Sequence, residues 1–224
     1  MPKSLIIDPA DFAKLYLSDY EYGKSARRTR EWTIPHLQRL GVKSGRVLSI
    51  GCANGIDVVE MRAAGYEAYG MDIYPPSEQA AQWCKQATAN AIPYETESFD
   101  AAIMLEVIEH IPHSEREKSA SEIRRVLKPG GVLILATPNR LFPVDEHSDN
   151  WVRVHSPFSD DTVSVSELEK LFQGKAEVLS WKKYFAFEMM PAARVLKPFM
   201  SFLDLPMVHR SPLNPHLFVA IRRS

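Results

Sequence analysis

The sequence predicts an α/β fold with a largely parallel sheet, on the strength of three stretches. In residues 46–72 an apolar strand is followed by a glycine turn, a helical segment, a second strand and the acidic residue Asp72. Residues 99–105 form an apolar run, which is typical of a central parallel strand. A helical segment and a further apolar strand at 132–136 come next. Strands and helices that alternate in this order build a sheet that is covered on both faces.

The N-terminal residues predict two helices. The pair Asp8-Pro9 is a usual helix start, because aspartate caps free N–H groups and proline suits the first turn. A second helical region covers residues 24–40, where Pro35 is expected to break the helix and Gly41 to end it. Its expected packing residues are Trp32, Leu37 and Leu40. The basic segment 26–30 has two interpretations, a solvated helix face or an anion site.

The glycine turn is expected to open a helix at Ile56, which ends where Gly65 takes a left-handed conformation. The next strand covers residues 67–71 and leaves Asp72 at its carboxyl end. Pro75, Pro76 and Ser77 then predict the start of another helix. This helix would carry Ala80, Trp83 and Cys84.

The second half of the chain predicts alternating elements and one long loop. The loop covers residues 137–165 and is rich in aromatic and ionisable side chains, which is more often functional than decorative after a strand. The expected elements are a helix opened by a capping box of Ser114 and Glu117 and running to Leu127, a strand at 132–136, a helix opened by Ser166 and Glu169, and strands at 178–187 and 217–222.

The glycine turn points to a nucleoside ligand. Gly51 and Gly55 let backbone approach a ligand closely, and the helix start that follows offers unpaired N–H groups. The carboxylate of Asp72, one βα length onward, is suited to accept two hydrogen bonds from a ribose diol. NAD is disfavoured, because a dinucleotide fingerprint counted from Gly51 needs glycine where Ala53 and Ile56 stand.

The same stretch resembles the class I S-adenosylmethionine (SAM) methyltransferases, whose first motif usually reads VLDIGCGTG. Here residues 47–55 read VLSIGCANG, and the match continues in ATANAIPYETESFD at 87–100, AAIMLEVIEHI at 101–111 and RVLKPGGVLILATPN at 125–139. The resemblance covers about residues 30–185. It implies a Rossmann-like, seven-stranded, mostly parallel sheet with an antiparallel last strand and helices on both faces.

The resemblance also implies one methyltransferase domain over residues 1–224. Within it, residues 1–44 would form a helical cap and residues 45–188 the SAM-binding core. Residues 189–215 would be an apolar insertion before the last strand. The insertion is the segment that departs most from a minimal member of the family.

By resemblance, the cofactor contacts fall on the glycine turn and on the ends of three strands. Asp72 would bind the ribose hydroxyls, Ile73 would press on the adenine, and Glu106 would lie near the methionine end. The full expected set is Ser49, Gly51, Cys52, Ala53, Gly55, Asp72, Ile73, Thr88, Ala89, Asn90 and Glu106. Cys52 is expected to pack under the ligand rather than to act as a nucleophile.

The chain departs from the family at two acids. The usual acid of the first motif is Ser49 here, and the acid common in the third motif aligns with Thr88. A hydroxyl accepts the same hydrogen bonds, but a charge-assisted bond is about twice as strong. Asp57 or Glu106 would have to compensate. The two departures leave open a catalytically silent, SAM-sensing or partner-binding protein.

Methyl transfer to a protonated oxygen or nitrogen needs a base, and several histidines are candidates. His110 closes the EVIEH segment, where the family often has a histidine, and its alternative is a capping or packing role. His147 and His155 lie in the loop expected to roof the acceptor pocket. Glu109 is a further candidate. No metal is expected, because the adjacent Asp145, Glu146 and His147 cannot all point at one site from an extended loop.

The leading prediction is therefore SAM-dependent methylation of a small, moderately apolar molecule, expected at oxygen. Residues 189–205 are rich in Met and Phe, which would suit a lid over such an acceptor. They would equally suit weak contact with a membrane surface, a homodimer interface or packing against the sheet, and a peripheral membrane adaptor is a further alternative.

Composition excludes other classes of function. The net charge of −1 argues against nucleic acid as an obligatory partner, since phosphate neutralisation needs a basic surface. The two cysteines make neither a CxxC pair nor a zinc spacing. The N-terminus has no signal-like pattern and no apolar run is long enough for a membrane span, so the expected location is the cytoplasm.

Overall fold

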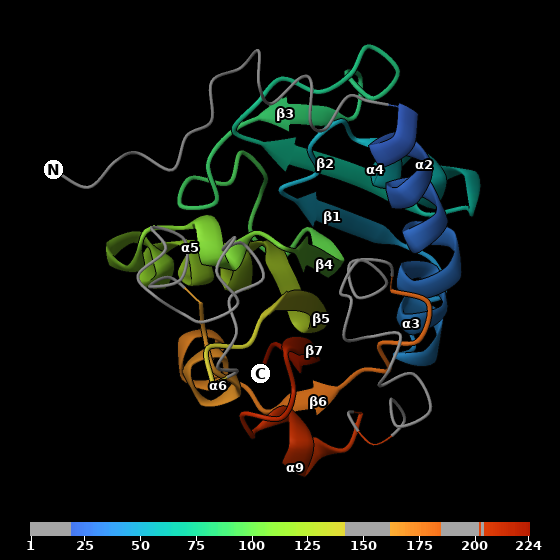
Figure 1. Cartoon of the computed structure of the whole chain (residues 1–224). Coiled ribbons are helices and arrows are strands. Elements are labelled where there is room, and N and C mark those ends of the chain that lie inside the picture. The colour runs from blue at the N-terminus through green and yellow to red at the C-terminus, as the bar shows by residue number, and fades with distance from the viewer. Residues whose placement is uncertain (1–18, 142–161, 185–201, 203) are drawn as a thin grey trace, which may run out of the picture.

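The computed structural model describes residues 19–141, 162–184, 202 and 204–224. Seven strands form one sheet in the order β3-β2-β1-β4-β5-β7-β6 (Figure 1). Within it only β7 is antiparallel to its neighbours, so the expectation of a mostly parallel sheet with a reversed last strand is confirmed. The strands are β1 Arg46–Ile50, β2 Glu67–Asp72, β3 Cys84–Gln86, β4 Phe99–Leu105, β5 Leu127–Pro138, β6 Ala176–Val178 and β7 His216–Arg222.

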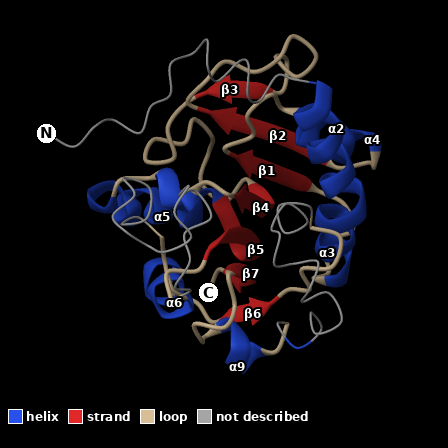
Figure 2. Cartoon of the chain, viewed as in Figure 1, coloured by secondary structure: helices blue, strands red, loops and turns tan. Residues whose placement is uncertain are grey.

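Helices cover both faces of the sheet, as expected (Figure 2). One face carries α2 Asp19–Arg28, the π-helical turn η1 Thr29–Thr33, α3 Ile34–Arg39 and α4 Ile56–Ala63. The other carries α5 His113–Val126 and α6 Val165–Phe172. The short 3₁₀ turn η2 Ile108–His110 follows β4, and α9 Pro206–His209 precedes β7. Among the described residues, none of the helices has the length and apolar character that crossing a membrane requires.

Trp32 packs the N-terminal helices against residues near the C-terminal end of the sequence. Its indole is fully buried and donates a hydrogen bond to the Ser180 carbonyl at 2.5 Å. It also packs edge-on against Tyr184 and Phe218, with ring centroids 5.0 and 5.9 Å away. The predicted packing roles of Trp32, Leu37 and Leu40 are therefore confirmed. Pro35 lies in the first turn of α3, directly after the wider π-helical turn η1, and the helix continues through it instead of breaking as expected. Gly41 follows α3 at φ +91°.

The helix predicted from Ser77 to Cys84 is wrong. The segment forms hydrogen-bonded turns, including Ala80 N–H to the Ser77 carbonyl at 3.0 Å, and then enters β3 at Cys84. Ala80 is fully buried, and a Cβ built on Gly55 would lie 2.4 Å from its side chain. The apolar residues that suggested a helix stripe are spaced to pack under the glycine turn and to pair Cys84 with Gly70.

Three other boundaries also differ from prediction. The helix α5 begins at His113 without a side-chain cap, so Ser114 does not open a capping box. The capping box of α6 is formed by Ser164 and Glu167, two residues before the expected pair. The sixth strand is only Ala176–Val178, and a turn follows it in which the Tyr184 N–H donates to the Trp181 carbonyl at 2.9 Å. The expected helix at Asp8-Pro9 lies outside the described residues.

Candidate functional site

The glycine turn joins β1 to α4 at the carboxyl edge of the sheet. Gly51 has φ +71°, and a Cβ there would lie 2.3 Å from the side chain of Val107. The N–H groups of Gly51 and Cys52 donate to the Met71 carbonyl at 2.8 and 3.1 Å. Gly55, at φ +79°, is the residue from which α4 starts. The turn is therefore held between β2 and the segment after β4, and only glycine fits at position 51.

Cys52 is buried under this turn. A hydrogen bond with the buried Cys84, together with burial, raises the pKa of the Cys52 thiol well above its usual value. A thiol that stays protonated is a poor nucleophile. The environment of Cys52 is thus that of a packing residue.

Asp72 ends β2 beside the turn and is partly buried. Its Oδ2 accepts the N–H of Ala53 at 2.8 Å, and its Oδ1 accepts the N–H of Tyr74 at 3.0 Å. Burial raises the pKa of this carboxyl, and the backbone N–H donors of Tyr74, Ala53 and Ile73 oppose the rise. A carboxylate has about four lone-pair sites, so this one retains acceptor capacity for a diol. Ala53, at φ +48°, holds the left-handed conformation of the glycine it replaces.

The missing acid at Ser49 has a substitute in the first turn of α4. The Ser49 hydroxyl is buried and donates to the carboxylate of Asp57, whose other oxygen accepts the N–H of Val58 at 2.8 Å. Burial raises the pKa of Asp57, while the Ser49 hydrogen bond and the charge of Arg28 lower it. Position 49 thus still borders a carboxylate, supplied by another residue.

The residues expected around an adenine follow β2 and β3. Ile73 is 44% exposed, next to Asp72. The hydroxyl of Thr88 donates to Asn90 Oδ1 at 2.7 Å, and Asn90 Nδ2 donates to Glu115 at 2.7 Å. Ala89 packs against the core under α5. The N–H of Ala87 bonds to the Asp72 carbonyl at 2.8 Å, which brings both segments to one edge.

Glu106 lies just beyond β4 and is held by residues from the end of the chain. Its carboxylate accepts hydrogen bonds from the Tyr184 hydroxyl at 2.7 Å and from His216 Nε2 at 2.7 and 2.9 Å. Burial by itself would raise the pKa of Glu106, but the charge and hydrogen bonds of His216, with that of Tyr184, lower it to about 2. Glu106 is therefore a fixed negative charge near neutral pH.

Arg28, at the end of α2, faces the same region. It lies in the basic segment 26–30, for which an anion site was one of two interpretations, but it was not among the expected cofactor contacts. Its guanidinium lies 5.6 Å from the centroid of the Tyr184 ring, and its charge lowers the pKa of both Asp57 and Glu106. Its Nε is buried without a hydrogen-bond partner. The signal was helical spacing, since Arg28 is four residues before Trp32 and so shares its buried face. A donor left in this way suits an anionic ligand group.

The base candidates differ in burial and in whether the structure describes them. Glu109, on η2, is buried, with one oxygen accepting from the Thr137 hydroxyl at 2.9 Å and the other without a partner. Burial and the charge of Glu106 raise the pKa of Glu109 to about 8. His110 is exposed at the end of η2. His147 and His155 lie outside the described residues, as do Asp145 and Glu146.

The described part of the chain contains no cluster of three His, Cys, Asp or Glu side chains able to hold a metal ion. Its residues do fit a SAM-like molecule. Asp72 can take the diol, the unpartnered Arg28 Nε can take a carboxylate, and Asp57 and Glu106 can take an amino group. No metal-binding role is assigned to any described residue.

Comparison with known families decides the class. A model described as a methyltransferase domain matches residues 17–174. The chain belongs to this methyltransferase family. The matched residues include the glycine turn, Asp72 and Glu106, so the site described above is part of the family's domain.

Curated relatives match part of this chain. A ubiquinone biosynthesis O-methyltransferase of Xanthomonas oryzae pv. oryzae is 31% identical over 113 residues, which are 46% of each chain. One from Cereibacter sphaeroides is 32% identical over 105 residues, 42% of each chain. The chain thus spans less than half the length of these relatives.

Solved structures share the fold. A Burkholderia thailandensis 1,6-didemethyltoxoflavin-N1-methyltransferase with bound S-adenosylhomocysteine has a TM-score of 0.60 at 16% identity, covering 96% of this chain and 87% of that one. A SAM-dependent methyltransferase from Aquifex aeolicus has a TM-score of 0.58 at 15% identity, covering 98% of this chain and 100% of that one. At these identities the likeness supports the fold, and the predicted Rossmann-like class is confirmed.

Proposed function

We propose that this methyltransferase-family chain binds SAM and transfers its methyl group to a small-molecule acceptor. The observation that carries the proposal is Asp72, a partly buried carboxylate oriented by the N–H groups of Ala53 and Tyr74 at the edge of a glycine turn. The two oxygens of Asp72 keep acceptor positions beyond these two bonds, and a ribose diol would use them. Membership of the family and the ubiquinone-pathway names of the relatives support the same class of reaction.

The proposed contacts follow the geometry around the turn. Gly51, Cys52, Ala53 and Gly55 would line the methionine and ribose side, with Asp72 on the ribose hydroxyls and Ile73 on the adenine. Thr88, Ala89 and Asn90 would offer polar groups and backbone to the adenine edge. Ser49 would act through Asp57 and, with Glu106, hold the amino group, while Arg28 would bind the carboxylate.

The cofactor, when bound, supplies a methyl group on a positively charged sulfur. The chain then needs to position the acceptor in line, exclude water and take a proton. We assign the proton to one of Glu109, His110, His147 and His155. Glu109 has the strongest support, because an unpartnered oxygen and a pKa of about 8 suit a base working near neutrality.

The acceptor is proposed to be small and moderately apolar, with oxygen as the methylated atom. The relatives are named as O-methyltransferases, and the chain's near-neutral charge gives nucleic acid little to bind. A homodimer, weak membrane-surface contact through residues 189–205 and a cytoplasmic location remain part of the proposal. Vesicle flotation tests the membrane contact: protein that stays at the bottom of the gradient would remove it, with the adaptor alternative.

Calorimetric titration with SAM and with S-adenosylhomocysteine tests the cofactor site. We expect micromolar binding by the native chain, and a loss of about a hundredfold or more in Asp72→Ala, which removes both ribose contacts. The matched control is Glu177→Ala, which removes an exposed carboxylate from β6. Absence of binding at millimolar cofactor would contradict the proposal and favour a partner-binding protein.

The alternative, a catalytically silent protein that senses SAM, rests on Thr88. This residue stands where the family commonly has an acid, and no substitute carboxylate has been assigned to it. The sensing protein differs from the enzyme in one measurable respect. A chain that binds SAM but leaves every phenol, catechol and carboxylate of a broad panel unmethylated, at several pH values, would favour sensing. Formation of S-adenosylhomocysteine that depends on one acceptor would favour the enzyme.

A further inference from the structure

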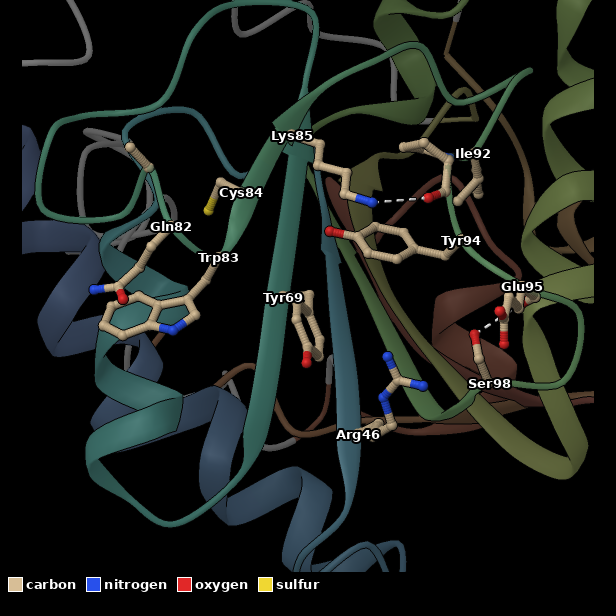
Figure 3. Close-up of a pocket in the computed structure, with 12 residues that line it drawn as sticks. Arg46, Tyr69, Gln82, Trp83, Cys84, Lys85, Ile92, Tyr94, Glu95 and Ser98 are labelled. Atoms are coloured by element: carbon tan, nitrogen blue, oxygen red, sulfur yellow. Dashed lines mark hydrogen bonds between the residues drawn. The ribbon is translucent and has the colours of Figure 1, made fainter.

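A pocket lies at the outer edge of the sheet (Figure 3), and one of its lining residues, Cys84, also packs under the glycine turn. It is a pocket of about 750 Å³ beside β3 and β2, here named the β3-edge pocket. Its lining includes Arg46, Tyr69, Trp83, Lys85 and Tyr94. In the segments before and after β3 the described chain forms turns and loops, so no described helix from these segments covers this edge of the sheet.

Aromatic rings form the wall of the β3-edge pocket. The rings of Tyr69 and Tyr94 lie 5.7 Å apart, and both pack on the buried Phe99. Tyr69 and Tyr94 are only partly buried, as is Trp83 on the other side of Tyr69 in Figure 3. All three line the pocket, so a flat guest in it would contact the parts of these rings that stay exposed.

Two cations stand on these rings. The Lys85 ammonium lies 4.5 Å from the centroid of the Tyr94 ring, and the Arg46 guanidinium lies 5.1 Å from that of Tyr69. Arg46 shares its charge with Glu67 at 3.3 Å. Lys85 donates to the Pro93 carbonyl at 3.2 Å, and among the described residues no carboxylate pairs with it. The ammonium therefore has two donor positions left for an anion.

The β3-edge pocket is distinct from the cofactor site. Arg46 begins β1, at the opposite end of the strand from Gly51, and Tyr69 stands three residues before Asp72 along β2. Glu95, the acidic group of the lining, lies beside Ser98 and well away from Lys85 in Figure 3. The Lys85 end of the pocket thus combines an unneutralised positive charge with flat aromatic surfaces.

We propose that the β3-edge pocket binds a planar aromatic anion, with its ring against Tyr69 and Tyr94 and its carboxylate or similar group on Lys85. The pocket offers a contact to each half of this ligand. The rings offer an apolar surface to the ligand's ring, and the ammonium offers its remaining donor positions to the ligand's negative group.

Three probes separate the two halves of the ligand. The probes are 2-naphthoate, the uncharged 2-naphthol and the non-aromatic cyclohexanecarboxylate, each titrated into the full chain by calorimetry. We expect 2-naphthoate to bind with a Kd on the order of 10⁻⁴ M and each of the others to bind about tenfold more weakly. Absence of saturable 2-naphthoate binding up to about 5 mM would overturn the proposal.

Lys85→Met locates the binding, and since Lys85 is exposed this substitution leaves the core unchanged. We expect 2-naphthoate to weaken about tenfold while 2-naphthol is unaffected. The control Lys118→Met removes an exposed lysine from α5 and should leave all three affinities unchanged. Undiminished 2-naphthoate binding in Lys85→Met, or its abolition by saturating S-adenosylhomocysteine, would place the probe elsewhere and overturn the proposal.

Discussion

The two ends of the candidate site are built in different ways. On the cofactor side, Gly51, Ala53 and Asp72 come from one stretch of 22 residues, and the polar groups of that turn satisfy one another through backbone hydrogen bonds. On the side of Glu106, the carboxylate meets Tyr184 and His216, which are 78 and 110 residues away along the chain. There Glu109 keeps a buried oxygen without a partner. Contacts within one short stretch of sequence fix the geometry of the first side. The geometry of the second side depends on contacts between segments that are far apart in the chain.

The largest expected effect comes from a substitution within the glycine turn. Gly51→Ala places a Cβ against Val107 at a left-handed φ, so the turn has to shift. We expect a loss of at least about tenfold in SAM affinity and about 2 kcal/mol of stability. Calorimetry and urea unfolding measure the two quantities.

Gly130→Ala is the matched control for Gly51→Ala. Gly130 has φ +76°, and a Cβ there would meet nothing within 4 Å. It should cost about 1 kcal/mol of stability and leave SAM affinity unchanged. Equal SAM affinities for the two variants would mean that close approach at Gly51 does not hold the turn.

The raised pKa of Glu109, beside Glu106, predicts that the stability of the protein depends on pH. Burial and Glu106 raise the pKa of Glu109 from its usual 4.5 to about 8, so the folded state binds more protons than the unfolded state between these values. The contribution of Glu109 to the free energy of unfolding is thus fully present below about pH 4.5 and is lost as pH rises through 8.

Urea unfolding of Glu109→Gln at about pH 6 and about pH 8.5 measures this effect, since glutamine carries no charge at either pH. Relative to the native chain, the variant should gain on the order of 2 kcal/mol between the two conditions. Glu177→Gln, on an exposed strand, serves as the reference and should follow the native profile. Parallel profiles for Glu109→Gln and the native chain would rule out a buried, charge-sensitive Glu109.

The smallest expected effect concerns a purely local feature, the start of α6. Ser164→Ala removes the capping box with Glu167 and should cost about 1 kcal/mol of stability. Ser166→Ala, at the position where sequence alone placed the cap, should cost clearly less. The reverse order of the two values would show that the helix starts where the sequence suggested.

The parts of the fold that could be predicted are those that local sequence determines. The unit from β1 to β2 was correct because glycine, apolar periodicity and a terminal acid act over a few residues. The segment 77–84 was wrong because Ala80 and Cys84 pack under Gly55 and Gly70, contacts that local spacing does not reveal. The mostly parallel sheet and the reversed β7 were expected from family resemblance and are confirmed by the structure.

The candidate site divides along the same line. Asp72 and the glycine turn could be placed from the sequence, because strand ends bring them to one edge. The pairing of Ser49 with Asp57 and the gathering of Arg28, Glu106 and Tyr184 could not be foreseen. They depend on side-chain directions across helix and sheet, which residue types alone do not specify. The roles of His147 and His155 stay predictions.

The position of β7 has a consequence for how the protein is made. This strand is the last in the chain, yet it lies between β5 and β6 and completes the cover over Trp32. During synthesis on the ribosome, β5 therefore presents an open edge, and α2 and α3 lack part of their packing, until residue 222 has emerged. Exposed edges and apolar faces of that kind are what chaperones bind. The nascent chain should depend on such protection until its final strand arrives.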